Sequence, residues 1–241
     1  MFTDMIQSTP QADQVTFHRA EHKFRIIGGD LSFIRKVLTS NCIPINHHKR
    51  VSTNHTLYFD DLSFSSYHEN KAGISRRWKS RIRWYDSSEQ TIFFEFKKRS
   101  ALLSLKERVK IELTKPITQL SYREIKKELR THLSPEQYER FLFRSDSILI
   151  NVYQREYFRD PHSKIRLTLD YNIGYYNQLQ ARHPRLQYSH HLPHLIILEC
   201  KIPLGSPERL ERLLSPLRLR LTQSSKYVQC LEALGLSQDV S

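Results

Sequence analysis

Glycine is scarce in this chain of 241 residues, which has only six of them. Neither GxGxxG nor GxxxxGK[ST] occurs in the sequence. Both motifs need glycine where the backbone comes close to a phosphate group, so the Rossmann and P-loop modes of nucleotide binding are excluded. If the protein binds phosphate, it does so with side chains.

Cysteine and histidine show no metal-binding pattern. The three cysteines, Cys42, Cys200 and Cys230, are far apart, and neither CxxC nor HExxH occurs. An odd number of cysteines without a pairing pattern is typical of a reducing compartment. Neighbouring side chains on a strand point to opposite faces, so the adjacent pairs His47-His48 and His190-His191 do not form a natural chelate. They are expected in loops or at the surface.

Long hydrophobic runs are also absent. No apolar stretch approaches the roughly 20 residues that a membrane span needs, and residues 1–14 contain no apolar signal-peptide region. We therefore expect a soluble, cytoplasmic protein. Residues 1–16 are expected to be a flexible leader, and residues 17–236 one domain without an internal linker.

Positive charge is abundant. Lysine and arginine number 38 against 25 aspartates and glutamates, which gives a formal net charge of +13. Apolar residues make up 39% of the chain, enough for a folded core. The charge predicts an anionic partner, but it does not distinguish among nucleic acid, polyphosphate, a nucleotide and an acidic membrane.

Charged residues alternate with other residues inside the segments expected to form strands. Residues two apart on a strand point to the same face, so each segment carries its charges on one side and apolar residues on the other. Five such segments predict a charged interior that holds a polyanion. Their charged residues include Arg81 and Arg83, Glu95 and Lys97, Lys106 and Arg108, Arg166 and Asp170, and Glu199 and Lys201.

The periodicity predicts an α+β fold, an antiparallel eight-stranded β-barrel with surrounding helices. Asp30 is expected to cap the first helix. Residues 174–193 are expected to form a loop or a crossing excursion. The expected strands are 17–27, 53–60, 77–85, 90–99, 105–113, 148–158, 164–171 and 194–203, and the expected helices are 31–40, 62–71, 121–131, 135–142, 207–217 and 225–234.

Nine short motifs follow one another in order. They are Arg19-x-Glu21-x-Lys23, Tyr58-Phe59-Asp60, Arg81-x-Arg83, Glu95-x-Lys97, Lys106-x-Arg108, Tyr153-x-Arg155, Arg166-Leu167-Thr168-Leu169-Asp170, Leu198-Glu199-x-Lys201 and Ser225-Lys226-Tyr227. From about Arg19 to Tyr227, this series resembles the polyphosphate-polymerase domain of the vacuolar transporter chaperone (VTC) family. That domain belongs to the triphosphate tunnel metalloenzymes, together with the CYTH phosphatases.

The resemblance implies a metal-dependent polyphosphate polymerase that moves the γ-phosphate of ATP onto a polyphosphate chain inside a basic tunnel. It implies that Glu199 holds Mn²⁺ or Mg²⁺ against the phosphates. It further implies catalytic roles for Arg81, Arg83, Lys97 and Lys226. The phosphate-binding residues that it implies are Lys23, Arg81, Arg83, Lys97, Lys106, Arg108, Arg155, Arg166, Lys201 and Lys226.

Two positions depart from the patterns of the relatives. Arg19 stands where the CYTH opening motif has its first glutamate, which favours a polymerase over a hydrolase. Gln223 stands where the family has a further lysine, which removes one cation from that end of the tunnel. Related domains are joined to membrane segments, so we expect this chain to release polyphosphate or to pass it to a separate membrane partner.

Two other functions remain open. One is hydrolysis of tripolyphosphate or a nucleoside triphosphate in the same tunnel, and the other is polyanion binding without catalysis, including RNA binding. Stacking on RNA bases needs exposed aromatic side chains among the cations, whereas Phe93, Phe94 and Phe96 are expected in the strand core. We therefore expect ATP and polyphosphate as partners and no specific nucleic acid.

Carboxylates and tyrosines inside the tunnel have a structural interpretation too. Glu21, Glu95 and Asp170 are expected either to neutralise nearby cations or to bind metal. Tyr58, Tyr153 and Tyr227 are expected in the core or the barrel wall.

Overall fold

One antiparallel sheet of ten strands organises the chain. A computed structural model describes residues 19–46, 49–86, 88–100, 103–187, 189–203, 207–222 and 225–235. The expected leader 1–16 and the pair His47-His48 lie outside these ranges. The strands are β1 (Arg19–Ile27), β2 (Ile43–Ile45), β3 (Val51–Asp60), β4 (Arg77–Tyr85), β5 (Ser88–Ser100), β6 (Leu103–Glu112), β7 (Asp146–Arg159), β8 (Arg166–Asn177), β9 (His190–Leu192) and β10 (Leu195–Pro203).

The expected α+β class is confirmed, but the sheet is not closed into a barrel. Eight strands follow the path β1-β10-β8-β7-β3-β4-β5-β6, while β2 pairs with β7 and β9 with β8. In the described part of the chain, β1 and β6 are therefore free edges. The outer edge of β1 is partly occupied by the segment before the last helix, because Leu221 bridges Phe24 and the Thr222 amide donates to the Lys23 carbonyl at 2.9 Å.

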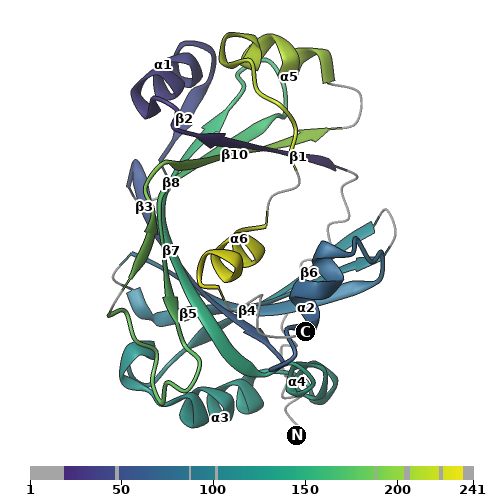
Figure 1. Cartoon of the computed structure of the whole chain (residues 1–241), viewed down its shortest axis with the longest axis vertical. Coiled ribbons are helices and arrows are strands. Elements are labelled where there is room, and N and C mark those ends of the chain that lie inside the picture. The colour runs from purple at the N-terminus through teal and green to yellow at the C-terminus, as the bar shows by residue number, and fades with distance from the viewer. Residues whose placement is uncertain are drawn as a thin grey trace, which may run out of the picture.

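The open sheet curls around its last helix, most of the other helices cover its outside, and α2 packs against the last helix (Figure 1). Helices α1 and α5 lie outside the half that contains β1, β8 and β10, and α3 and α4 lie outside the half that contains β4 and β5. We call the side that faces α6 the concave face. The helices are α1 (Leu31–Asn41), α2 (Ser65–Lys71), α3 (Tyr122–His132), α4 (Pro135–Leu142), α5 (Pro207–Leu214) and α6 (Lys226–Ala233), with short 3₁₀ turns at Ile117–Gln119 and Ser215–Leu217.

Strand alternation separates the apolar core from the charged face. On β4, Ile82 and Trp84 are fully buried and belong to the core that also contains Ile125 of α3 and Phe141 of α4. On β8, Leu167 belongs to a second core with residues of α1 and α5. The residues between them on each strand point to the concave face, as the sequence pattern predicts.

Helix caps explain where several helices begin. Asp30 is the N-cap of α1, as expected, and its carboxylate accepts from the Ser32 and Phe33 amides at 2.8 and 3.2 Å. Ser121 and Ser134 each form a capping box, at α3 and α4. Each cap satisfies amide groups that have no partner within the helix.

The expected loop at 174–193 is wrong at both ends. Strand β8 continues to Asn177, and His190–Leu192 forms the short strand β9 beside it. Gly174 interrupts the apolar pattern here, and a Cβ at this position would lie 3.2 Å from the ring of His191. Glycine permits this close approach of the two strands, which a sequence pattern alone does not distinguish from a turn.

Helix α6 is held on the concave face by one apolar cluster and by polar contacts of its side chains. Val228 and Leu231 belong to a cluster that includes Leu149 of β7. The Tyr227 hydroxyl donates to Asp60 Oδ2 at 2.6 Å, and both residues are buried. No helix within the described ranges combines the length and the apolar character that crossing a membrane requires.

We expect Tyr227→Phe to lower the free energy of unfolding by about 1.5–3 kcal/mol, because it removes a buried hydrogen bond to a carboxylate. Urea unfolding of the purified protein measures this loss. Tyr67→Phe is the matched control, since the Tyr67 hydroxyl contacts Glu232 at a long 3.4 Å and a smaller loss is expected. Equal losses in the two variants would contradict the anchoring role of Tyr227.

Candidate functional site

The first group of charges on the concave face is centred on Glu95 of β5. This carboxylate is 1% exposed, yet it contacts cations of two neighbouring strands. Arg81 of β4 and Lys106 of β6 each lie 2.7 Å from it, and Arg108 lies 3.5 Å away. Burial opposes ionisation of Glu95, but Arg81, Arg83 and Lys106 outweigh it and hold its pKa well below the usual range.

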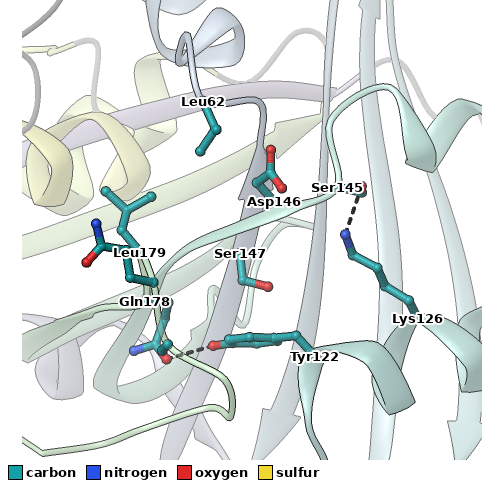
Figure 2. A pocket seen from close by; sticks show the side chains of 10 residues that line it. Leu62, Tyr122, Lys126, Ser145, Asp146, Ser147, Gln178 and Leu179 are labelled. Carbon is teal, nitrogen blue, oxygen red and sulfur yellow. Dashed lines mark hydrogen bonds between the residues drawn. The ribbon is translucent and has the colours of Figure 1, made fainter.

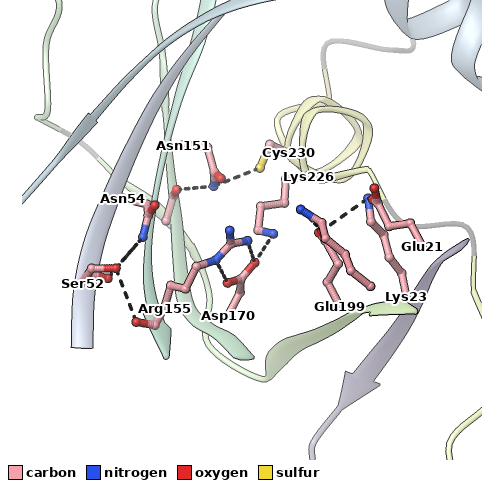
Figure 3. Close-up of polar contacts among 12 residues, drawn as sticks. Glu21, Lys23, Ser52, Asn54, Asn151, Arg155, Asp170, Glu199, Lys226 and Cys230 are labelled. Atoms are coloured by element: carbon pink, nitrogen blue, oxygen red, sulfur yellow. Dashed lines mark hydrogen bonds and ion pairs between the residues drawn. The ribbon is translucent and has the colours of Figure 1, made fainter. Parts of the chain in front are cut away.

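A second group is centred on Asp170 of β8, which is fully buried. Arg155 of β7 donates to its two oxygens at 2.5 and 2.7 Å, and Lys226 of α6 donates to Oδ2 (Figure 3). Burial again opposes ionisation, and Arg155 and Lys226 lower the pKa of Asp170 in spite of it. The ring of Tyr153 lies near both cations, with its centroid 5.2 Å from the Arg155 guanidinium carbon and 4.6 Å from the Lys226 nitrogen.

A third group connects the two halves of the sheet. The Lys23 ammonium lies 2.7 Å from Glu21 and 3.9 Å from Glu199, and Figure 3 shows these three side chains together. Glu21 also lies 3.5 Å from Lys97 of β5. Side chains thus form an ion pair between β1 and β5, although β1 has no backbone pairing on that side with β6.

Glu199 is the residue that the sequence analysis assigned to the metal. Its neighbours are cations, with Lys201 at 3.7 Å and Lys23 at 3.9 Å. Burial opposes its ionisation, but Lys23 and Arg155 hold its pKa well below the usual range. Glu199 is therefore an ionised carboxylate among cations on the concave face.

The residues present fit a divalent metal that arrives with phosphate. Among the described residues, no three His, Cys, Asp or Glu side chains form a metal-binding group. Mg²⁺ sites commonly use one or two carboxylates and complete their coordination with phosphate oxygens and water. The ionised Glu199 supplies the first part of such a set, and a bound phosphate chain would supply the rest.

The remaining predicted residues differ in exposure. Arg83 is 8% exposed and its Nε has no hydrogen-bond partner in the described part. Arg108 lies over the ring of Phe93, 3.7 Å from its centroid. Arg166 is exposed, directly opposite Lys201 in the register. Gln223 and the side chain of Arg19 lie outside the part of the chain that the structure describes.

The aromatic residues of the strands differ in burial. Tyr58, Tyr153 and Tyr227 are buried, as expected. Phe93 is not part of the strand core with Phe94 and Phe96, because it lies on the concave face, half-buried beneath Arg108.

Sequence reasoning missed one lysine of this face. Lys79, Arg81 and Arg83 follow one another at intervals of two residues on β4, and Lys79 lies directly opposite Lys97. The alternation on β4 is the signal that could have found it. The expected strand 77–85 already contained Lys79, but the resemblance to the family did not include this position among the phosphate-binding residues.

A separate pocket of about 210 Å³ lies between α3 and the start of β7 (Figure 2). The Tyr122 hydroxyl donates to Gln178 at 2.7 Å, and the Lys126 ammonium to Ser145 at 3.1 Å. Its lining contains none of the residues predicted to bind phosphate or metal. The charged concave face is therefore the candidate site.

Comparisons with known proteins agree with the motif order. The family model described as the VTC domain matches residues 18–235. Nothing among the curated proteins matches the chain. One similar solved structure is that of the PH1819 protein from Pyrococcus horikoshii OT3, which is 14% identical, with 89% of this chain and 99% of that chain covered and a TM-score of 0.49. That likeness is too weak to add to the fold described above.

We expect Glu95→Gln to lower the free energy of unfolding by about 3–5 kcal/mol, because it leaves Arg81 and Lys106 without their buried counter-ion. Urea unfolding measures this. The depressed pKa of Glu95 also makes the free energy of unfolding depend on pH. The stabilisation by ionised Glu95 is fully present above the ordinary glutamate pKa of about 4.3, and it is lost as the pH falls through the folded-state pKa.

The matched control is Glu112→Gln, since Glu112 forms an exposed ion pair with Lys110 at 2.7 Å on β6. An exposed pair contributes about 0–1 kcal/mol. If the two variants lost the same stability, Glu95 would not be the counter-ion that holds this part of the face.

Proposed function

Because the chain belongs to the VTC-domain family, we propose that it is a polyphosphate polymerase that transfers the γ-phosphate of ATP onto the end of a polyphosphate chain. The family is associated with polyphosphate synthesis. The concave face is the proposed site, and ATP and polyphosphate are the proposed substrates.

The observation that supports this proposal is the convergence of cations from six strands and one helix on a single face. Among the described residues these cations outnumber the carboxylates Glu21, Glu95, Asp170 and Glu199. A face with surplus positive charge needs an anion, and a linear polyanion can contact many cations at once. The cations are Lys23, Lys79, Arg81, Arg83, Lys97, Lys106, Arg108, Arg155, Lys201 and Lys226.

Phosphoryl transfer mainly requires positioning and neutralisation of charge. A terminal oxygen of the polyphosphate chain attacks the γ-phosphorus, a new P–O–P bond forms, and the bond from the γ-phosphorus to the oxygen that bridges it to the β-phosphate breaks. ADP leaves with that oxygen and its electron pair. No nucleophilic side chain is needed.

The basic side chains suit these tasks in different ways. The planar guanidinium groups of Arg81 and Arg83 can each donate two hydrogen bonds to one phosphate group. Lys97 of β5 and Lys226 of α6 would place compact charges against non-bridging oxygens. A divalent metal held by Glu199 and the phosphates would neutralise further charge when bound.

Incubation of the purified protein with ATP and Mn²⁺, followed by gel separation of the products, tests the proposed reaction. We expect a ladder of long polyphosphate together with ADP, because a phosphate chain is the acceptor. Orthophosphate without a ladder would show that the protein is a hydrolase and not a polymerase. A protein that forms neither product but binds tripolyphosphate would be a binding module.

We expect Glu199→Gln to abolish the Mn²⁺-dependent turnover while largely preserving tripolyphosphate binding, because the cations remain and only the carboxylate is lost. Activity assays and calorimetry separate the two effects. Glu208→Gln, at an exposed position of α5, is the control and should keep full activity. Unchanged turnover in Glu199→Gln would show that Glu199 is not the metal ligand.

A further inference from the structure

Three lysines lie side by side across the concave face. Lys79 of β4 is directly opposite Lys97 of β5, which is directly opposite Lys106 of β6. Like charges in direct cross-strand register destabilise a sheet. Two of the three have a carboxylate nearby, since Lys97 lies 3.5 Å from Glu21 and Lys106 lies 2.7 Å from Glu95.

Lys79 forms no ion pair in the described part of the chain. Its amine nitrogen lies 6.0 Å from the centroid of the Tyr58 ring on β3. The charged groups that act on it are Arg81 on its own strand, Lys97 on β5, and Lys23 and Glu21 on β1. Only Glu21 is negative, and it is shared by Lys23 and Lys97.

These surroundings disfavour the charged form of Lys79. Burial lowers its pKa well below the usual lysine value, and repulsion from Arg81, Lys97 and Lys23 lowers it further. The same row shows smaller effects, because burial lowers the pKa of Lys97 and brings that of Lys106 to about 8 in spite of Glu95. Without an anion nearby, Lys79 therefore loses its proton more readily than an ordinary lysine.

We propose that Lys79 is a further phosphate-binding residue whose counter-ion is the phosphate chain itself, so that the chain binds to this face together with a proton from solvent. This inference rests on the proposed function, since it takes a linear polyphosphate as the ligand. The proton joins the neutral amine of Lys79, and the resulting ammonium donates to a phosphate oxygen. No other bond forms or breaks.

The position of Lys79 relative to the arginines supports this assignment. Arg81 has its own carboxylate, Glu95, whereas Arg83 and Lys79, two residues to either side on β4, form no ion pair in the part of the chain that is described. A phosphate chain lying along β4 would meet, on each side of Arg81, one cation that forms no ion pair among the described residues. A lysine can lose its charge when the site is empty, whereas an arginine cannot.

Isothermal titration calorimetry with tripolyphosphate tests the proposal. Titrations at one pH near neutrality, in buffers with different ionisation enthalpies, give the number of protons taken up per bound anion. The variants are Lys79→Met and Lys79→Arg. The control is Lys98→Met, which removes an exposed lysine from the opposite face of β5, directly opposite Trp78.

We expect Lys79→Met to bind tripolyphosphate about tenfold more weakly than Lys98→Met, because it loses a charge-assisted hydrogen bond. Lys79→Arg should keep most of the affinity, because its charge is permanent. Both Lys79 variants should take up about one proton less per bound anion than the wild type, while Lys98→Met should match it. Protons that tripolyphosphate itself exchanges are common to all four proteins and cancel in this difference.

Two results would overturn this inference and leave the proposed function standing. One is that Lys79→Met binds as tightly as Lys98→Met, and the other is that Lys79→Arg takes up as many protons as the wild type. Thermal unfolding verifies that the variants fold, and Lys79→Met should be at least as stable as the wild type because it removes a half-buried amine that forms no ion pair in the described part of the chain. Failure of the wild type to bind tripolyphosphate would overturn the proposed function as well.

Discussion

Buried carboxylates neutralise part of the positive charge on the concave face, which is why many cations can lie close together there. Glu95 and Asp170 are almost completely buried, and each contacts cations that come from different elements. Buried charges without partners are costly, so Arg81 and Arg155 could not lie where they do without these carboxylates. Because Asp170 contacts both Arg155 and Lys226, the ion pair that neutralises the face also places α6 against the sheet. The fold and the candidate site therefore depend on the same interactions.

Arginine and lysine occupy different environments on this face. Arg81 and Arg155 each form an ion pair with a buried carboxylate, which suits a group that stays charged under all ordinary conditions. Lys79 and Lys97 lie where burial and neighbouring cations lower the pKa. The empty face can thus reduce its own repulsion through its lysines, while the arginines keep the charge that attracts a polyanion.

The curl of the sheet, rather than closure by hydrogen bonds, brings the two halves of the site together. The outer edge of β1 is paired in part with Leu221 and Thr222, so β6 does not complete a barrel with it. Glu21 and Lys97 instead form an ion pair between β1 and β5. A tunnel was expected from the resemblance to the family, and the structure has an open sheet whose concave face carries the predicted residues.

The sequence alone determined most elements and, for most strand residues, the side to which the side chain points. Period-two alternation depends only on local backbone geometry, which is why Arg81, Glu95 and Lys106 were placed on one face together. It could not determine which cation has a counter-ion. Lys79 and Lys97 share one pattern, yet Glu21 from the far edge of the sheet reaches only Lys97. That difference, like the open edge at β1, depends on contacts between residues far apart in the chain, and only the tertiary structure decides those.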